Sequence, residues 1–187
     1  MRRTAALLAA LVLTGCTTLT PAQQARVDAY QALADRVTAH YGASRVLVMR
    51  ADLRTGTGGV MEHRGRLLVS ERTLTSRWGE ALVAHELAHW VLGHRFEETV
   101  PGPDKELAAH VEAVRVLMVG KSWIEEQAFR TYLAYLWSAK LAQDRGTPVP
   151  LGHRAVCREI ADFVSRFPAQ ASMAKTCPGE GKPEGRP

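Results

Sequence analysis

The 187-residue sequence has only three cysteines, which excludes a small scaffold held together by disulfides. Its 15 glycines and 9 prolines are too few for a collagen-like or linker-dominated chain. Positive charge is also modest: the formal net charge of +5 falls to +3 without Arg2 and Arg3, so we expect no nucleic-acid partner. What the chain does contain is 46% hydrophobic and 23% charged residues, a composition typical of a globular domain with a core.

The N-terminus has the three parts of a secretory signal. Met1-Arg2-Arg3 is positively charged, residues 4–13 are almost wholly apolar, and small residues lead to Cys16. This ending, Leu13-Thr14-Gly15-Cys16, resembles the bacterial lipobox. The resemblance implies that residues 1–15 are a lipoprotein signal peptide and that a lipidated Cys16 begins an anchor and linker over residues 16–20. The alternative is an ordinary cleaved signal followed by a cysteine that is there by chance.

Lipidation would place the protein in the bacterial cell envelope, with the membrane as its partner through Cys16. Thr17 is not an aspartate, so in a host with two membranes we expect the outer membrane, facing the periplasm. Because exported proteins meet an oxidising compartment, Cys157 and Cys177 are a candidate disulfide. Two free thiols are the alternative, and neither cysteine lies in a C-x-x-C pair that would indicate zinc or redox chemistry.

Hydrophobic periodicity and turn residues predict a mostly helical α+β fold with a small antiparallel sheet ahead of a central helix. The first helix should begin at Thr20-Pro21, an N-cap followed by proline, and end at Gly42. Strands are expected over 45–50, 60–63 and 66–70, and further helices over 76–92, 104–119, 122–146 and 153–167. Ser122-x-x-Glu125 has the form of a capping box for the fourth of these five helices. The domain then spans 21–167, and 168–187 is expected to be a disordered tail.

The chemistry of the sequence is concentrated in His85-Glu86-Leu87-Ala88-His89, an H-E-x-x-H motif inside a predicted helix. Histidines four positions apart project from the same face of a helix, so both imidazoles can reach one metal ion. Glu86 then lies close enough to act on a metal-bound water without being a ligand. Zinc suits this set, because it accepts neutral imidazole and leaves a position open when the protein provides three ligands.

The surroundings of the motif strengthen this interpretation. The helix is apolar nearly all round, so it should be buried, and two histidines and a glutamate inside it need a metal or hydrogen bonds to be satisfied. Glu106 follows His89 by 17 residues, on the next predicted helix, after a Pro-Gly-Pro turn that folds this helix back. The strand over 66–70 lies just ahead of the motif, where an extended substrate could pair with a sheet edge.

His85 to His94, followed by Glu106-Leu107-Ala108-Ala109, resembles the gluzincin type of zinc metallopeptidase, closest to the compact ImmA/IrrE-like domain. The resemblance covers residues 60–120 and implies a zincin-like fold with zinc held by His85, His89 and Glu106, and with Glu86 as general base. One position departs from the pattern: His110 stands where that family has asparagine or aspartate. His110 therefore either steadies a ligand histidine without binding the metal itself, or replaces Glu106 as the third ligand.

Other candidates have simpler interpretations. His94 follows a helix-ending glycine and is expected to interact with the helix dipole. Glu112, His40, His63 and His153 lack ligand spacing and are expected at the surface. Tyr132 and neighbouring residues of the long helix should pack in the core, although Tyr132 or Tyr135 could stabilise an oxyanion.

The leading hypothesis is a lipid-anchored zinc metallopeptidase that hydrolyses peptide bonds of a peptide or protein substrate in the cell envelope. The alternative is an inactive metallopeptidase-like lipoprotein that serves as a binding or assembly module. An intact Glu86 argues against this alternative, because a binding module has no need of that carboxylate. The sequence names neither the substrate nor the oligomeric state.

Overall fold

The computed structural model describes residues 19–53, 59–62, 64–94, 102–149, 153–175 and 177. The expected mostly helical α+β fold is confirmed. In chain order the elements are α1 (Pro21–Tyr41), β1 (Leu47–Arg50), β2 (Gly59–Glu62), β3 (Arg66–Val69), α2 (Glu71–Thr75), α3 (Gly79–Val91), α4 (Pro103–Lys121), α5 (Glu125–Asp144), α6 (Val156–Val164) and a 3-10 helix, η1 (Pro168–Met173).

The three strands form one sheet, but it is mixed and not antiparallel as expected. β3 lies in the centre, antiparallel to β2 and parallel to β1, so the order is β1-β3-β2. Gly65, at a left-handed φ of 72°, makes the turn between β2 and β3. The carbonyl of Gly65 also accepts a hydrogen bond from the N–H of Leu47 (2.8 Å), which aligns the start of β1 with the start of β3. β1 therefore pairs with β3, which begins directly after this turn, and not with β2, the next strand in the chain.

Helix α1 forms as its ends predict. The side chain of Thr20 accepts a hydrogen bond from the N–H of Gln23, and the side chain of Gln23 accepts one from the N–H of Thr20. At the other end, Gly42 terminates the helix at a φ of 62°. Its buried face packs against α3, α4 and β1. A Cβ on Gly120 of α4 would lie 3.0 Å from Leu33, so the absence of a side chain there permits this close approach of α1 and α4.

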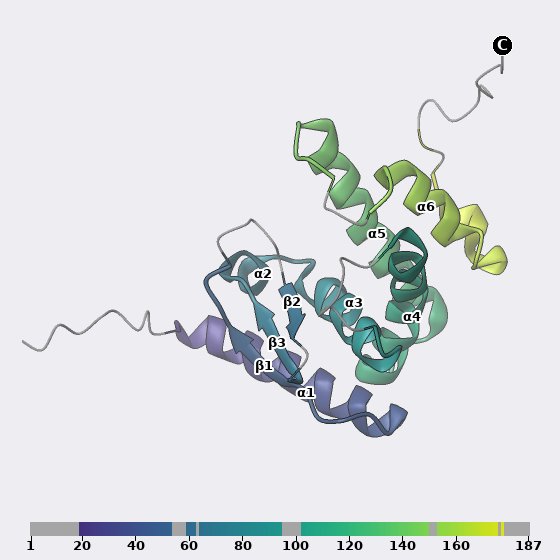
Figure 1. The fold of residues 1–187 in the computed structure, drawn as a ribbon. Helices are drawn as coiled ribbons and strands as arrows, with labels where there is room; N and C mark the ends of the chain where they lie inside the picture. Colours follow the sequence, from purple (N-terminus) through teal and green to yellow (C-terminus); the bar gives the residue numbers. More distant parts are fainter. Residues whose placement is uncertain are drawn as a thin grey trace, which may run out of the picture.

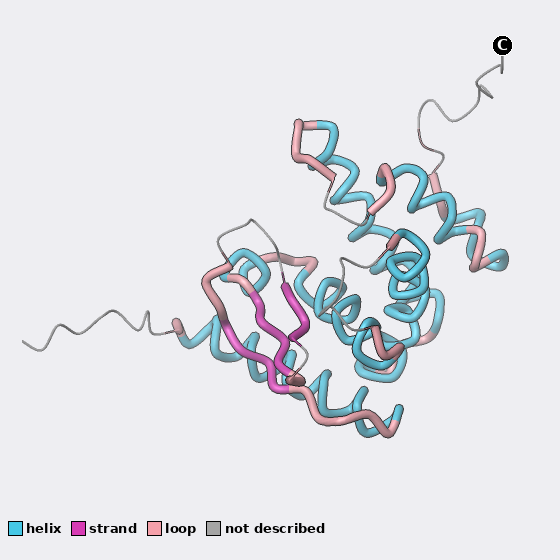
Figure 2. Tube along the Cα trace, viewed as in Figure 1, coloured by secondary structure: helices cyan, strands magenta, loops and turns pink. Residues whose placement is uncertain are grey.

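Helix α3 occupies the centre of the molecule, with α1, α2, α4, α5, β2 and β3 all in contact with it (Figure 1). The sheet and α1 lie to one side, and α5 and α6 to the other (Figure 2). Its side chains Ala81, Val83, Ala84, Leu87 and Ala88 are fully buried, as the sequence predicted for an apolar helix. The preceding short helix α2 was not expected; Ser70 caps it by accepting from the N–H of Thr73.

Two expectations for the C-terminal half are wrong. Ser122 does not cap α5, because it has left-handed dihedrals (φ 56°, ψ 37°) and ends α4, whereas an N-cap needs an extended backbone. Ile124 stands at the N-cap of α5. The predicted start of the disordered tail at residue 168 is also too early, because residues 168–173 form η1, which contacts α5 and α6.

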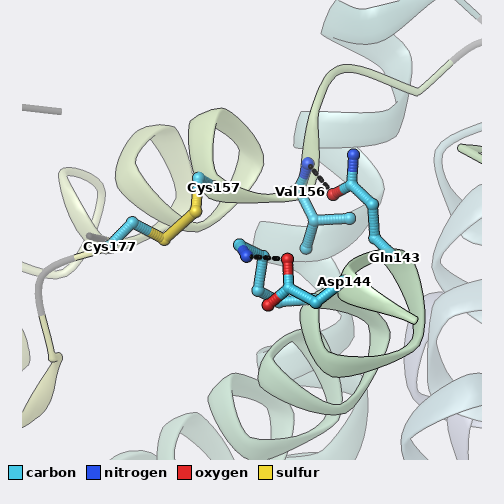
Figure 3. The surroundings of a disulfide bond; sticks show 6 residues. Gln143, Asp144, Val156, Cys157 and Cys177 are labelled. Atoms are coloured by element: carbon cyan, nitrogen blue, oxygen red, sulfur yellow. Dashed lines mark hydrogen bonds and ion pairs between the residues drawn. A yellow bond between two sulfur atoms is a disulfide. The ribbon is translucent and has the colours of Figure 1, made fainter. Parts of the chain in front are cut away.

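Cys157 of α6 and Cys177 form a disulfide, which fastens the segment after η1 to α6 (Figure 3). The start of α6 is also attached to the end of α5: the N–H of Val156 donates to the side-chain oxygen of Gln143 at 3.3 Å (Figure 3). Cys177 is therefore connected covalently to α6, and the start of α6 is connected by a hydrogen bond to the end of α5.

None of the helices within the described residues combines the length and apolar character needed to cross a membrane. The signal peptide and Cys16 lie outside the described residues.

Removal of the disulfide should lower stability. Its two cysteines are 20 positions apart, and closing a loop of that size contributes about 3 kcal/mol in the chain-entropy model. Cys157→Ser or Cys177→Ser should therefore lower Tm by about 6–12 °C for a chain of this length. Cys16→Ser is the matched control and should leave Tm unchanged; equal values for all four proteins would contradict the structural role of the bond.

Candidate metal centre

Helix α3 brings His85 and His89 together, one turn apart on one face. The side chains are almost fully buried, and their Nε2 atoms lie 3.2 Å from each other. At that distance, two neutral imidazoles can share one proton or one metal cation between their Nε2 atoms. The local spacing of the motif thus translates directly into two nitrogen donors that point at the same place.

Glu106 completes this group from the first turn of α4. Its Oε2 lies 3.2 Å from His85 Nε2 and 3.4 Å from His89 Nε2, and the residue is 4% exposed. Pro103 occupies the first turn of α4, where a missing N–H costs nothing, so the chain can begin this helix close to α3. Together His85, His89 and Glu106 form a buried set of three ligand atoms that could hold a metal ion.

The distances in this set fit a small tetrahedral cation. Ligands about 2.0–2.1 Å from a tetrahedral zinc ion lie about 3.3 Å from one another, close to the separations found here. Glu106 Oε2 is buried and has no hydrogen-bond partner among the described residues. A buried carboxylate oxygen without a donor is costly, and a cation at the centre of the three atoms would satisfy it.

His110 lies beside this set of three ligand atoms and not within it. It lies one turn after Glu106 on α4, buried, and its Nδ1 is 2.8 Å from the hydroxyl of Tyr132 on α5. The same hydroxyl is 3.0 Å from His85 Nδ1. The structure therefore groups Glu106 with the two motif histidines and connects His110 to His85 through the hydroxyl of Tyr132.

His89 also has an outer partner, and it is not the expected one. Gly93, at a φ of 68°, reverses the chain after α3, so that the N–H of His94 donates to the carbonyl of His89 at 2.9 Å. This turn places His94 Nδ1 2.9 Å from His89 Nδ1. His94 thus contacts a candidate ligand directly, where the sequence had indicated only an interaction with the helix dipole.

Glu86 lies on the side of α3 that faces β2. A backbone hydrogen bond from Met61 reaches its carboxylate, but burial outweighs this bond and, with the charge of Glu106, raises the pKa of Glu86 to about 8. A Cβ on Gly59 would lie 2.7 Å from Leu82 and 3.5 Å from Cγ of Glu86, so β2 crosses very close to this side chain. Glu86 is therefore a carboxylate with a high proton affinity beside the donor set.

Burial has the opposite effect on the pKa values of the two histidine donors. It lowers the pKa of His85 to about 4, which keeps this imidazole neutral and able to coordinate. Burial would raise the pKa of Glu106, but the imidazoles of His85 and His89 hold it well below its usual range. At neutral pH the set is therefore two neutral nitrogens and one carboxylate, which are zinc ligands in their coordinating forms.

Two residues of the centre were not predicted. His153, expected at the surface, places Nε2 3.4 Å from Glu106 Oε2, and its Nδ1 is 3.0 Å from Oε1 of Glu159 on α6. No spacing signal connects these residues to the motif; they arrive because α6 packs on α4 and α5. Glu112 is likewise buried and not at the surface, because Tyr41 donates to it and Arg115 pairs with it at 2.9 Å.

A cavity of about 250 Å³ lies between α3 and α5. Its lining includes Gly79 and Leu82 of α3 and Tyr135, Ala139 and Ala142 of α5. Leu82 precedes Glu86 by one helical turn. Burial and then the charge of Glu86 raise the pKa of Tyr135, so this hydroxyl stays protonated near the carboxylate.

Comparisons with protein-family models, with curated proteins and with solved structures give no match for this chain.

The raised pKa of Glu86 predicts a pH dependence of stability in the metal-free protein. Between about pH 4.5 and pH 8 the folded protein keeps a proton on Glu86 that the unfolded chain releases, so stability falls as pH rises through this range. The difference in unfolding free energy between wild type and Glu86→Gln should shift by about 1–2 kcal/mol between pH 6.5 and 8, against wild type. Denaturant titrations with chelator present would measure it. Parallel pH profiles of the two proteins would show that Glu86 is not perturbed.

Proposed function

We propose that this protein is a zinc-dependent hydrolase of the metallopeptidase type. The observation that carries the proposal is the convergence of His85 Nε2 and His89 Nε2 of α3 with Glu106 Oε2 of α4, within 3.2–3.4 Å of one another, next to Glu86 in the sequence of α3. When bound there, zinc would supply a Lewis acid and an activated water. The donor set favours this ion because it combines neutral imidazole and carboxylate with tetrahedral spacing.

The residues around the donors have separable roles. Glu86 takes a proton from the attacking water and returns it to the leaving amine, and a pKa of about 8 suits a base that must accept and release protons near neutral pH. Tyr132 contacts Nδ1 of His85 and His94 contacts Nδ1 of His89, which fixes each ring with its Nε2 toward Glu106.

The position of the sheet favours an extended peptide as substrate. β3, the strand that the sequence offered for pairing, is flanked by β1 and β2 and has no free edge. β2 is an edge strand of this sheet and contacts α3 beside Glu86. A peptide added along β2 would extend the strand whose Met61 N–H donates to the Glu86 carboxylate.

We place this activity in the bacterial cell envelope, on the strength of the lipobox-like ending at Cys16. The disulfide between Cys157 and Cys177 is compatible with an exported protein, because such bonds persist in oxidising compartments. An inactive binding lipoprotein remains the alternative, and the retained Glu86 carboxylate disfavours it.

Cys16→Ser tests the envelope assignment. The variant should lose incorporation of a fatty-acid analogue and should leave the detergent phase, because acyl chains on Cys16 are the proposed anchor. Cys177→Ser is the matched control and should label like wild type. Equal labelling of the Cys16 variant would refute the anchor and leave the metal centre untouched.

Glu86→Gln separates an enzyme from a binding module. The substitution removes the proton acceptor without removing a proposed ligand, so hydrolysis should fall by about 10²–10⁴-fold while zinc is retained. Cleavage of a peptide library, followed by mass spectrometry, measures the first quantity, and metal analysis of the same sample measures the second.

Glu80→Gln provides the control, because Glu80 is on α3 as well but pairs with Lys121 away from the donors. It should cleave like wild type, and chelator should abolish cleavage by both. Wild-type rates from Glu86→Gln would eliminate the proposed base.

A further inference from the structure

Glu106 has a second group of potential ligands besides His85 and His89. His110 and His153 each offer a ring nitrogen, and these atoms and a carboxylate oxygen of Glu106 lie within 4.8 Å of one another. Glu106 and His110 are buried on α4, and His153 is partly buried just ahead of α6. Glu106 is therefore common to two sets of three donors.

The inner nitrogen of His110 is buried without a hydrogen bond from any part of the chain that the structure describes. His110 is 2% exposed, and its Nε2 makes no hydrogen bond among the described residues. Oε2 of Glu159 lies 3.7 Å from this nitrogen, beyond hydrogen-bonding distance. Whether this nitrogen carries a proton or a lone pair, it is left unsatisfied in the interior, and a cation between it and Glu106 would remove that defect.

The outer nitrogens of both rings are arranged for coordination. Glu159 lies 3.0 Å from His153 Nδ1 and is itself held by the N–H of Arg154 at 3.1 Å, so a proton on Nδ1 leaves the lone pair on Nε2 facing Glu106. This is the carboxylate–histidine arrangement that commonly supports metal ligands. Tyr132 offers the same support to His110, because its oxygen can accept from Nδ1 of His85 and of His110 together.

We propose that Glu106, His110 and His153 form a second divalent-cation site, with Glu106 shared between the two ions and Glu159 beside it. The inference rests on the proposed function, since the first ion uses the same carboxylate. Adjacent cations joined by a carboxylate are characteristic of two-metal hydrolases, so the proposal places this chain in that class. The donors of the second set are more widely spaced than those of the first, and the second ion should bind more weakly.

Cobalt binding tests the proposal without any substrate. The metal-free full-length chain, purified in detergent, is dialysed against increasing Co²⁺ and the bound metal is counted. Wild type should bind two equivalents, the second at least tenfold more weakly, and the second should reduce the cobalt paramagnetic-resonance signal per ion because the two ions are coupled through Glu106. His110→Ala and His153→Ala should each bind one equivalent and keep the uncoupled signal.

His40→Ala is the matched control, because His40 is exposed on α1, and it should bind two equivalents like wild type. His153→Ala, on the segment before α6, keeps the test valid if His110→Ala fails to fold. One equivalent in wild type overturns the second site and leaves the proposed function standing. Two equivalents in wild type and in both site variants show an adventitious ion only. No cobalt in wild type removes the first site, and the proposed function with it.

Discussion

A buried carboxylate surrounded by imidazoles is the constraint on which this structure depends. Oε2 of Glu106 lies within 3.4 Å of Nε2 of His85, His89 and His153, in an interior where unsatisfied polar atoms are costly. Four elements must meet to build this arrangement: α3 supplies two rings, α4 the carboxylate, α5 the supporting Tyr132, and the start of α6 the third ring. Contacts between these helices are what keep the polar atoms in place.

The apolar surface of α3 gives the polar centre its setting. Because Val83, Ala84, Leu87 and Ala88 are fully buried, His85 and His89 are buried with them and stay neutral. The same burial raises the pKa of Glu86 to about 8, so this carboxyl group holds a proton more tightly than an ordinary glutamate. One structural fact, a helix covered on nearly every side, thus accounts both for the neutral imidazoles and for the raised pKa of the carboxyl group next to them.

The parts of the centre that follow from local spacing could be predicted from the sequence. His85, Glu86 and His89 need only the periodicity of one helix, and Glu106 needs only that the next helix folds back. His153 and Glu159 could not be predicted, because they reach the centre through the packing of α6, and no spacing relates them to the motif.

The errors in the predicted fold also come from contacts that the local sequence pattern does not contain. The parallel pairing of β1 with β3 depends on a contact between Leu47 and Gly65, far apart in sequence, and a local reading favoured a simple meander. Ser122 matched a capping pattern, but the end of α4 imposed left-handed dihedrals on it. In both cases a tertiary constraint overrode a correct local preference.

X-ray absorption at the zinc edge, on the full-length chain with one equivalent of zinc, tests the central claim most directly. The account predicts about four nitrogen and oxygen neighbours at about 2.0–2.1 Å, with two imidazoles among them and no sulfur. His89→Ala should remove one imidazole from that shell. A sulfur neighbour, a six-oxygen shell, or an unchanged spectrum in the variant would contradict a metal held by His85, His89 and Glu106.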